Sequence, residues 1–182
     1  MIKKYLKTAL ILAAICAVAA IVLAVLNKVT APAIQAYEEQ KTTSALEAVS
    51  RGMEIGEYVE VNEGNISYMY PLTSNGQVCG YILGLNSNGY GGRLDIIASF
   101  DKTGFVMEAI LVSDSETPGV GKKAEAPGYM DKFIGTGTDE NPVPTSKSML
   151  SDADSAAVSG ATMTFTGITK ALAAGSEFVK SL

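Results

Sequence analysis

The sequence predicts an α+β protein in which an N-terminal transmembrane helix precedes an antiparallel-sheet domain with flanking helices. Three observations carry this prediction: an apolar run opens the chain, two hairpin signals occupy its middle, and a helical pattern closes it. We divide the chain into a cytoplasmic tip and transmembrane anchor at residues 1–28, a helical stalk at 29–52, and an extracytoplasmic domain at 53–182.

The predicted anchor is an uncharged, almost wholly apolar run of 18 residues at positions 9–26. This is close to the ~20 residues that a helix needs to cross a bilayer. Three lysines precede the run and Lys28 follows it, so we expect a single-pass cell-membrane protein with a cytoplasmic N-terminus. The alternative is a cleaved signal peptide, for which the small residues at 31–33 are suitable, although the run is long for a signal.

Residues 27–51 show apolar residues near helical spacing beside a charged stretch at 38–41. They form either a second helix or a continuation of the anchor. Pro32 suits a helix start or a kink.

Residues 52–113 are predicted to form β-structure. Strands at 66–72 and 77–85 flank an Asn-Gly pair, which is a strong hairpin signal. A second pair of strands, 94–100 and 106–112, flanks a turn at 101–104, and residues 57–61 form a further short strand.

Helical segments complete the predicted domain. A short helix is expected at 124–133, followed by a solvated loop rich in Gly, Pro and Thr. The last segment carries an apolar stripe at helical spacing, which predicts a helix packed on the core. The stripe consists of Ile168, Ala171, Leu172, Gly175, Val179 and Leu182.

The composition excludes several function classes. The chain has no histidine, which excludes Ser-His-Asp and Cys-His catalysis and His-ligated metals within it. Its two cysteines cannot hold an iron–sulfur cluster by themselves. With 19 acidic against 14 basic residues it is a poor nucleic-acid binder. We therefore assign no catalytic residue and no metal ligand.

The segment Val-Ser-Gly-Ala-Thr-Met-Thr at 158–164 places small residues and three hydroxyls just before the C-terminal helix. Such a turn suits a phosphate, because backbone N–H groups and the helix dipole favour an anion there. The alternative is simple capping of the helix by Ser and Thr.

Residues 159–162 (Ser-Gly-Ala-Thr) resemble the flavinylation motif of the FMN-binding domains in the G subunit of the Rnf complex and in the C subunit of the sodium-pumping NADH:quinone reductase. Residues 89–92 (Gly-Tyr-Gly-Gly) and 116–121 (Glu-Thr-Pro-Gly-Val-Gly) also resemble segments of that family. The resemblance implies FMN joined through its phosphate to Thr162 by a separate flavin transferase. It further implies a phosphate turn shaped by Ser159, Gly160, Ala161 and Thr164, and a flavin ring lined by Glu116, Thr117, Pro118 and Gly119.

The family implies an electron relay that is not an enzyme alone. It would pass electrons among iron–sulfur and membrane subunits of an Rnf-type, ion-translocating ferredoxin:NAD oxidoreductase. One departure bears on covalent attachment: Ala156 stands where the family usually has an Asp that matters to the transferase, and Asp152 and Asp154 lie just upstream.

The alternatives are a stand-alone membrane-anchored flavoprotein of another electron-transfer or reductase system, and a module that has lost its flavin. A hydrolase is disfavoured because no pair of nucleophile and base is visible.

Overall fold

The computed structural model describes residues 2–114 and 121–182. The chain divides into two compact units, Met1–Lys41 and Thr42–Leu182. One long helix, α1 (Ile2–Ser50), contributes to both units, so residues 27–50 continue the anchor helix rather than forming a second one. Helical structure persists through Pro32.

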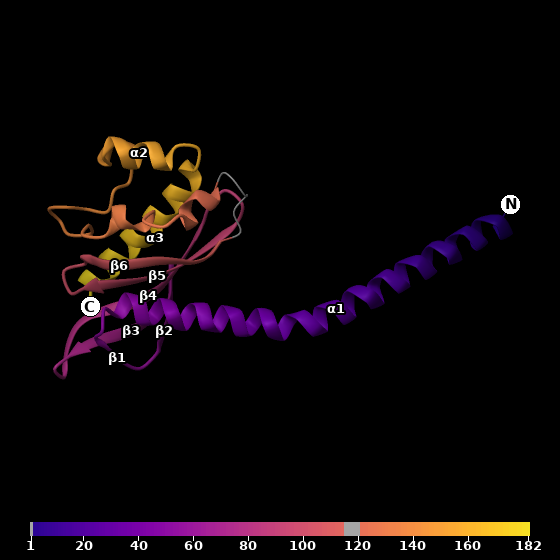
Figure 1. Ribbon diagram of the computed structural model, residues 1–182, viewed down its shortest axis with the longest axis horizontal. Helices are drawn as coiled ribbons and strands as arrows, with labels where there is room; N and C mark the ends of the chain where they lie inside the picture. Colours follow the sequence, from indigo (N-terminus) through magenta and orange to yellow (C-terminus); the bar gives the residue numbers. More distant parts are fainter. Residues whose placement is uncertain (1, 115–120) are drawn as a thin grey trace. The chain divides into compact units, whose positions relative to one another are not determined.

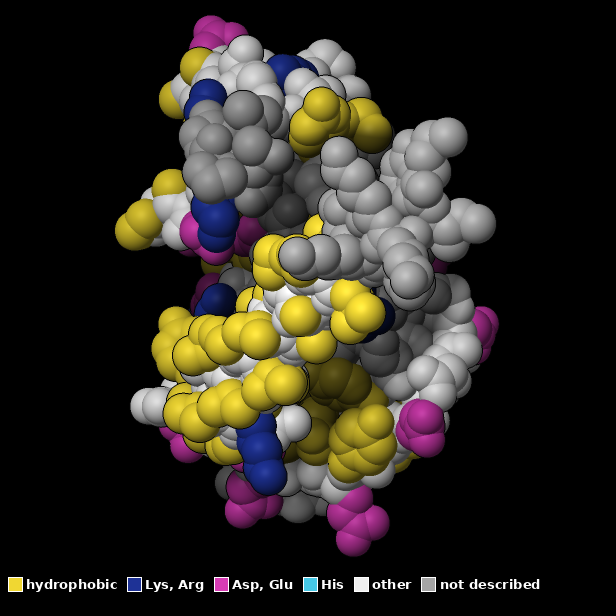
Figure 2. Space-filling model, turned by 90° about the vertical axis from the view of Figure 1, so that its right-hand side faces the viewer, with side chains coloured by type: hydrophobic (Ala, Val, Ile, Leu, Met, Phe, Trp, Pro, Cys, Tyr) yellow, Lys and Arg dark blue, Asp and Glu magenta, His cyan; other side chains and the backbone are white. Residues whose placement is uncertain are grey.

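The first unit is the apolar part of α1. Its large hydrophobic side chains from Leu10 to Leu26 are 51–66% exposed. Figure 2 views the molecule from the side on which the chain begins, and yellow hydrophobic side chains gather in the lower half of that view. A helix that is apolar all round and unburied is suited to lipid rather than to water. The helix is long and apolar enough to cross a membrane, by length and composition.

The second unit is built on a six-stranded antiparallel sheet in the order β1-β3-β4-β5-β6, with β2 also paired to β3 (Figure 1). The strands are β1 (Glu54–Ile55), β2 (Val59–Glu63), β3 (Ile66–Ser74), β4 (Gln77–Asn88), β5 (Arg93–Asp101) and β6 (Val106–Asp114).

Both predicted hairpins are present. Asn75 and Gly76 adopt φ values of 53° and 76°, the left-handed pair that a two-residue hairpin turn requires. At the β5–β6 turn the Asp101 carboxylate accepts hydrogen bonds from the backbone N–H groups of Thr103 (2.7 Å) and Phe105 (3.1 Å). These local bonds fix the register of neighbouring strands.

The helix predicted at 124–133 is replaced by two short 3₁₀ helices, η1 (Gly121–Glu125) and η2 (Met130–Phe133). Pro127 and Gly128 separate them, and Gly128 has a φ of +77° that ends regular helix. A third, η3 (Lys147–Met149), follows the loop. The chain then forms α2 (Asp152–Val158), which the sequence did not predict, and α3 (Thr162–Lys180).

Apolar side chains pack on both faces of the sheet. On one face the α3 residues Ile168, Ala171 and Leu172 are fully buried in a cluster with β4 and β5. On the other face Ala45 and Val49, from the last turns of α1, join a second cluster. The predicted α3 stripe is therefore confirmed except at its last member, because Leu182 is 58% exposed beyond the end of the helix.

Candidate functional site

The segment 158–164 forms a tight connection between α2 and α3. The Ser159 N–H donates to the Ala156 carbonyl (3.1 Å) and closes α2, and the Ala161 N–H donates to the Val158 carbonyl (3.0 Å). Between them Gly160 has a φ of +87°, a left-handed conformation that L side chains rarely adopt. The chain reverses here within three residues, and α3 begins at Thr162.

The first turn of α3 has no side-chain cap. Its N-cap residue is Ala161, whose methyl group offers no acceptor, and no side-chain cap hydrogen bond forms in the described structure. The N-cap carbonyl of Ala161 accepts its helical hydrogen bond from the Phe165 N–H, at 2.9 Å. The opening N–H groups and the helix dipole of this 19-residue helix therefore suit an external anion. No Ser or Thr side chain caps α3 in the described structure, so the alternative of simple helix capping is wrong.

The predicted hydroxyl residues differ in exposure. Thr162 and Ser159 are exposed, whereas Thr164 is fully buried. Thr162 also anchors the helix start, because its carbonyl accepts a hydrogen bond from the Thr166 hydroxyl (2.8 Å). Of the two threonines in the motif, Thr162 is thus the one whose side chain is exposed to solvent.

A hollow of about 200 Å³ lies directly at this turn and is lined by Tyr90, Gly160, Ala161, Thr162, Met163 and Thr164. Pockets that enclose a whole small ligand are usually ~300–1,000 Å³. The hollow can therefore hold the phosphate end of a nucleotide but not a complete flavin.

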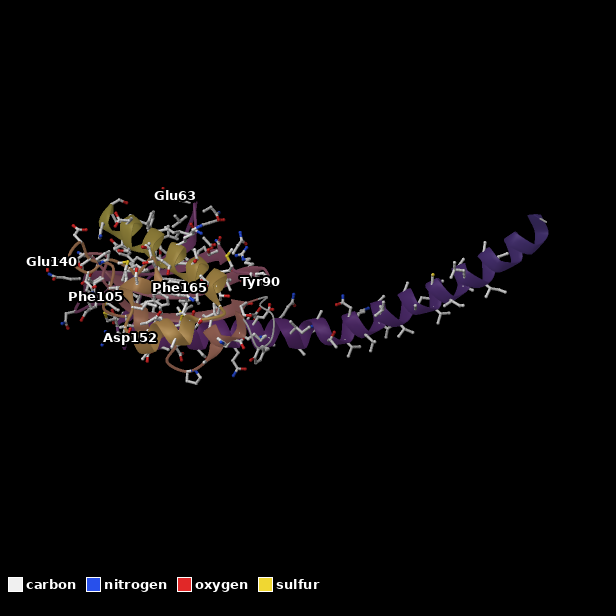
Figure 3. All side chains as sticks on the ribbon, turned by 90° about the horizontal axis from the view of Figure 1, so that it is seen from above. Glu63, Tyr90, Phe105, Glu140, Asp152 and Phe165 are labelled. Carbon is white, nitrogen blue, oxygen red and sulfur yellow. The ribbon has the colours of Figure 1, made fainter. Side chains whose placement is uncertain are left out.

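Tyr90 reaches the hollow from the glycine-rich turn between β4 and β5. The turn is closed by a hydrogen bond from the Gly89 N–H to the Gly92 carbonyl (2.8 Å), and the Tyr90 side chain is 71% exposed. Figure 3 shows Tyr90 at the end of the domain where α3 begins. The sequence indicated this turn, but Tyr90 was not predicted to belong to the site. The signal that could have identified it is an aromatic residue among glycines.

A glycine on α3 brings the two segments together. A Cβ built on Gly167 would lie 2.6 Å from the carbonyl oxygen of Asn88, the last residue of β4. The missing side chain lets the first turns of α3 approach the end of β4, immediately before the Tyr90 turn. The site is thus assembled from Tyr90 and from residues 160–164, which lie 70 or more positions further along the chain.

The acidic residues near Ala156 occupy different settings on α2. Asp154 is half-buried, and its carboxylate accepts a hydrogen bond from the Ser151 hydroxyl (2.6 Å) at the helix start. Asp154 also interacts with Lys132. Burial lowers the pKa of the Lys132 ammonium, and the charge of the Asp154 carboxylate offsets part of that lowering. Asp152 is exposed and lies one helical turn before Ala156, on the same face of α2.

The residues expected to line the flavin ring, Glu116, Thr117, Pro118 and Gly119, lie outside the described residues. Among residues 2–114 and 121–182 no group of three or more His, Cys, Asp or Glu side chains is placed to hold a metal ion.

Comparison with known proteins gives two family matches. Residues 89–177 match the FMN-binding domain family, from the Tyr90 turn through nearly all of α3. Residues 1–49 match the RnfG N-terminal region, which here corresponds to α1.

Two named relatives agree with these matches. The chain is 30% identical over 152 residues to the G subunit of the Na(+)-translocating ferredoxin:NAD(+) oxidoreductase complex of Acetobacterium woodii, covering 76% of this chain and 73% of the relative. It is 29% identical over 101 residues to the G subunit of the proton-translocating ferredoxin:NAD(+) oxidoreductase complex of Clostridium ljungdahlii, covering 56% of this chain and 54% of the relative.

Proposed function

Because this chain belongs to the family of Rnf complex G subunits, an FMN-binding family with an N-terminal candidate membrane helix, we propose that it relays electrons through an FMN held covalently on Thr162. FMN, when bound, supplies reversible electron acceptance. The single observation that carries this proposal is the exposed Thr162 hydroxyl at an uncapped helix start, beside a hollow of phosphate size. These residues fit the phosphate end of the cofactor.

Attachment requires an activated donor. Joining free FMN to the Thr162 hydroxyl would expel water, which is a poor leaving group, so the donor must be a phosphoanhydride of FMN such as FAD. A bond then forms between Thr162 Oγ1 and the FMN phosphorus, and the bond to AMP breaks. AMP leaves with the electron pair, and the hydroxyl proton passes to a base. The chain has no histidine to serve as that base, so a separate flavin transferase supplies it.

The chain's own residues would then position the product. The phosphodiester keeps one negative charge, and the N–H groups at the start of α3 stabilise it. Gly160 keeps the turn open, since its +87° φ and missing side chain leave the backbone accessible. Ala156 stands where the family usually has an Asp that matters to the transferase. Asp152 is our candidate to supply that carboxylate instead, because it is exposed on the same face of α2.

We further propose that the N-terminus is cytoplasmic and that the domain lies outside the cell membrane. Three lysines precede the apolar run and only Lys28 follows closely, which favours this orientation. Protease added to intact protoplasts should remove the domain, and protection of the domain in intact protoplasts but not in lysed ones would refute the orientation.

Partners are then the membrane and iron–sulfur subunits of an Rnf-type complex. Purification without such subunits would instead favour a stand-alone anchored flavoprotein.

Flavin fluorescence on a denaturing gel tests the covalent link. The full chain, expressed with a flavin transferase, should give a fluorescent band that is absent without the transferase. Thr162→Val should abolish the band. Thr145→Val is the matched control, because it makes the same change at an exposed threonine outside the motif and the hollow, and it should keep the band. A band that persists in Thr162→Val would refute the assignment, and a yellow native protein without a band would mean that FMN binds non-covalently.

A further inference from the structure

Lys123 lies against the turn that precedes Thr162, although 36 residues separate it from that turn in the chain. Its side-chain ammonium donates a hydrogen bond to the Ser159 carbonyl at 2.9 Å. The ammonium nitrogen also lies 3.5 Å from where a Cβ on Gly160 would be. Thr162 follows Gly160 by two residues, so the Cα atoms of these two residues are at most about 8 Å apart. A phosphate on the Thr162 hydroxyl is therefore within reach of the Lys123 ammonium.

The positive charge of Lys123 is not neutralised in the described part of the chain. Its neighbour Lys122 forms ion pairs with Glu125 (2.9 Å) and Asp114 (3.9 Å). Lys123 forms no ion pair among residues 2–114 and 121–182. The Ser159 carbonyl takes one of its three N–H donors and leaves its full charge, so two donors remain for another acceptor.

We propose that Lys123 is a phosphate-binding residue of this site, an inference that rests on the proposed attachment of flavin to Thr162. Its ammonium draws the FMN phosphate of the incoming donor toward Thr162 and then pairs with the phosphodiester. A charge-assisted bond from Lys123 and the N–H groups of α3 would hold the anion from two sides. The competing explanation is structural: Lys123 merely caps the C-terminal carbonyls of α2.

Three variants of Lys123 separate charge from capping. Lys123→Arg keeps the charge, Lys123→Gln keeps a donor for Ser159 but loses the charge, and Lys123→Met loses both. Lys102→Gln is the charge-matched control, because Lys102 is exposed in the β5–β6 turn. Initial rates of flavin incorporation are measured on the full chain with FAD and a flavin transferase, at low and high salt. Thermal unfolding of each flavin-free variant checks that it is folded.

We expect Lys123→Gln and Lys123→Met to incorporate flavin about tenfold more slowly at low salt, with Lys123→Arg within about threefold of wild type. The difference should shrink at high salt because the charge is exposed to solvent. Lys102→Gln should match wild type. Equal rates for wild type, Gln and Met would overturn the inference, and a Gln variant as fast as wild type with only Met slow would assign Lys123 to capping.

A second readout separates binding of the phosphate from recognition by the transferase. In chains loaded to completion, the phosphorus NMR resonance of the phosphodiester should shift in Lys123→Gln but not in Lys102→Gln. An unchanged resonance would overturn contact with the phosphate. A wild-type chain that takes up no covalent flavin would overturn the proposed attachment and this inference together, whereas a loaded wild type with unaffected Lys123 variants would overturn this inference alone.

Discussion

The close approach of α3 to the end of β4 makes Gly167→Ala an informative perturbation. The added methyl carbon would lie 2.6 Å from the Asn88 carbonyl oxygen and 3.0 Å from a Leu94 methyl group. Non-bonded heavy atoms prefer ~3.5–4.0 Å, so the backbone of β4 or α3 must move by about 1 Å. Because Asn88 immediately precedes the Tyr90 turn, that movement separates the two segments that line the hollow.

The magnitude follows from two opposing terms. Forcing one extra carbon into a packed site costs about 1–3 kcal/mol. Replacing Gly by Ala in a helix interior recovers about 1 kcal/mol of helix propensity. The expected net destabilisation is up to about 2 kcal/mol, which lowers the melting temperature by up to about 8 °C for a chain of this size.

Gly175→Ala is the matched control on the same helix. There the added carbon meets the side chains of Phe100 and Leu83, at 2.8 and 3.2 Å, rather than backbone. Both variants should melt lower than wild type, measured on the full chain in mild detergent. Only Gly167→Ala should also slow covalent flavin incorporation. A Gly167→Ala chain that is as stable as wild type and loads equally fast would refute the idea that this contact assembles the site.

Two further predictions concern stability. Burial raises the pKa of Tyr68 from 10.0 to about 12. As the pH rises, the unfolded chain therefore loses the phenol proton before the folded chain does. The stabilisation that is present below pH 10 is lost as the pH rises to about 12. Tyr68→Phe should therefore lose less stability between pH 9 and 11, and urea midpoints that fall equally in both chains would contradict this. The buried Ser176 hydroxyl lies 2.8 Å from the Gly104 carbonyl and 2.7 Å from the Gly137 carbonyl, so Ser176→Ala should cost about 1–3 kcal/mol in urea unfolding. Ser181→Ala, at an exposed hydroxyl, is the control and should change little.

Features set by neighbouring residues were predictable from the sequence. The apolar run predicted the first helix, Asn75-Gly76 predicted the β3–β4 hairpin, and the 3.6-residue stripe predicted the buried face of α3. Each depends on local sterics, local hydrogen bonds or a simple repeat. The family resemblance likewise rested on short contiguous motifs, and the FMN-binding and RnfG family matches confirmed it.

Other features required the tertiary structure, because they depend on atoms far apart in the chain. Periodicity did not distinguish regular helix from 3₁₀ turns around Gly128, and the stripe did not reveal that Leu182 lies past the last packed turn. The family resemblance proposed Thr162 for the covalent link, but only the tertiary structure shows that packing buries Thr164 and leaves Thr162 exposed. Lys123 carried no local signal at all, since its position against Ser159 arises only when η1 packs beside the start of α3. Long-range packing decides which side chains share a site, and that information is not contained in any short stretch of sequence.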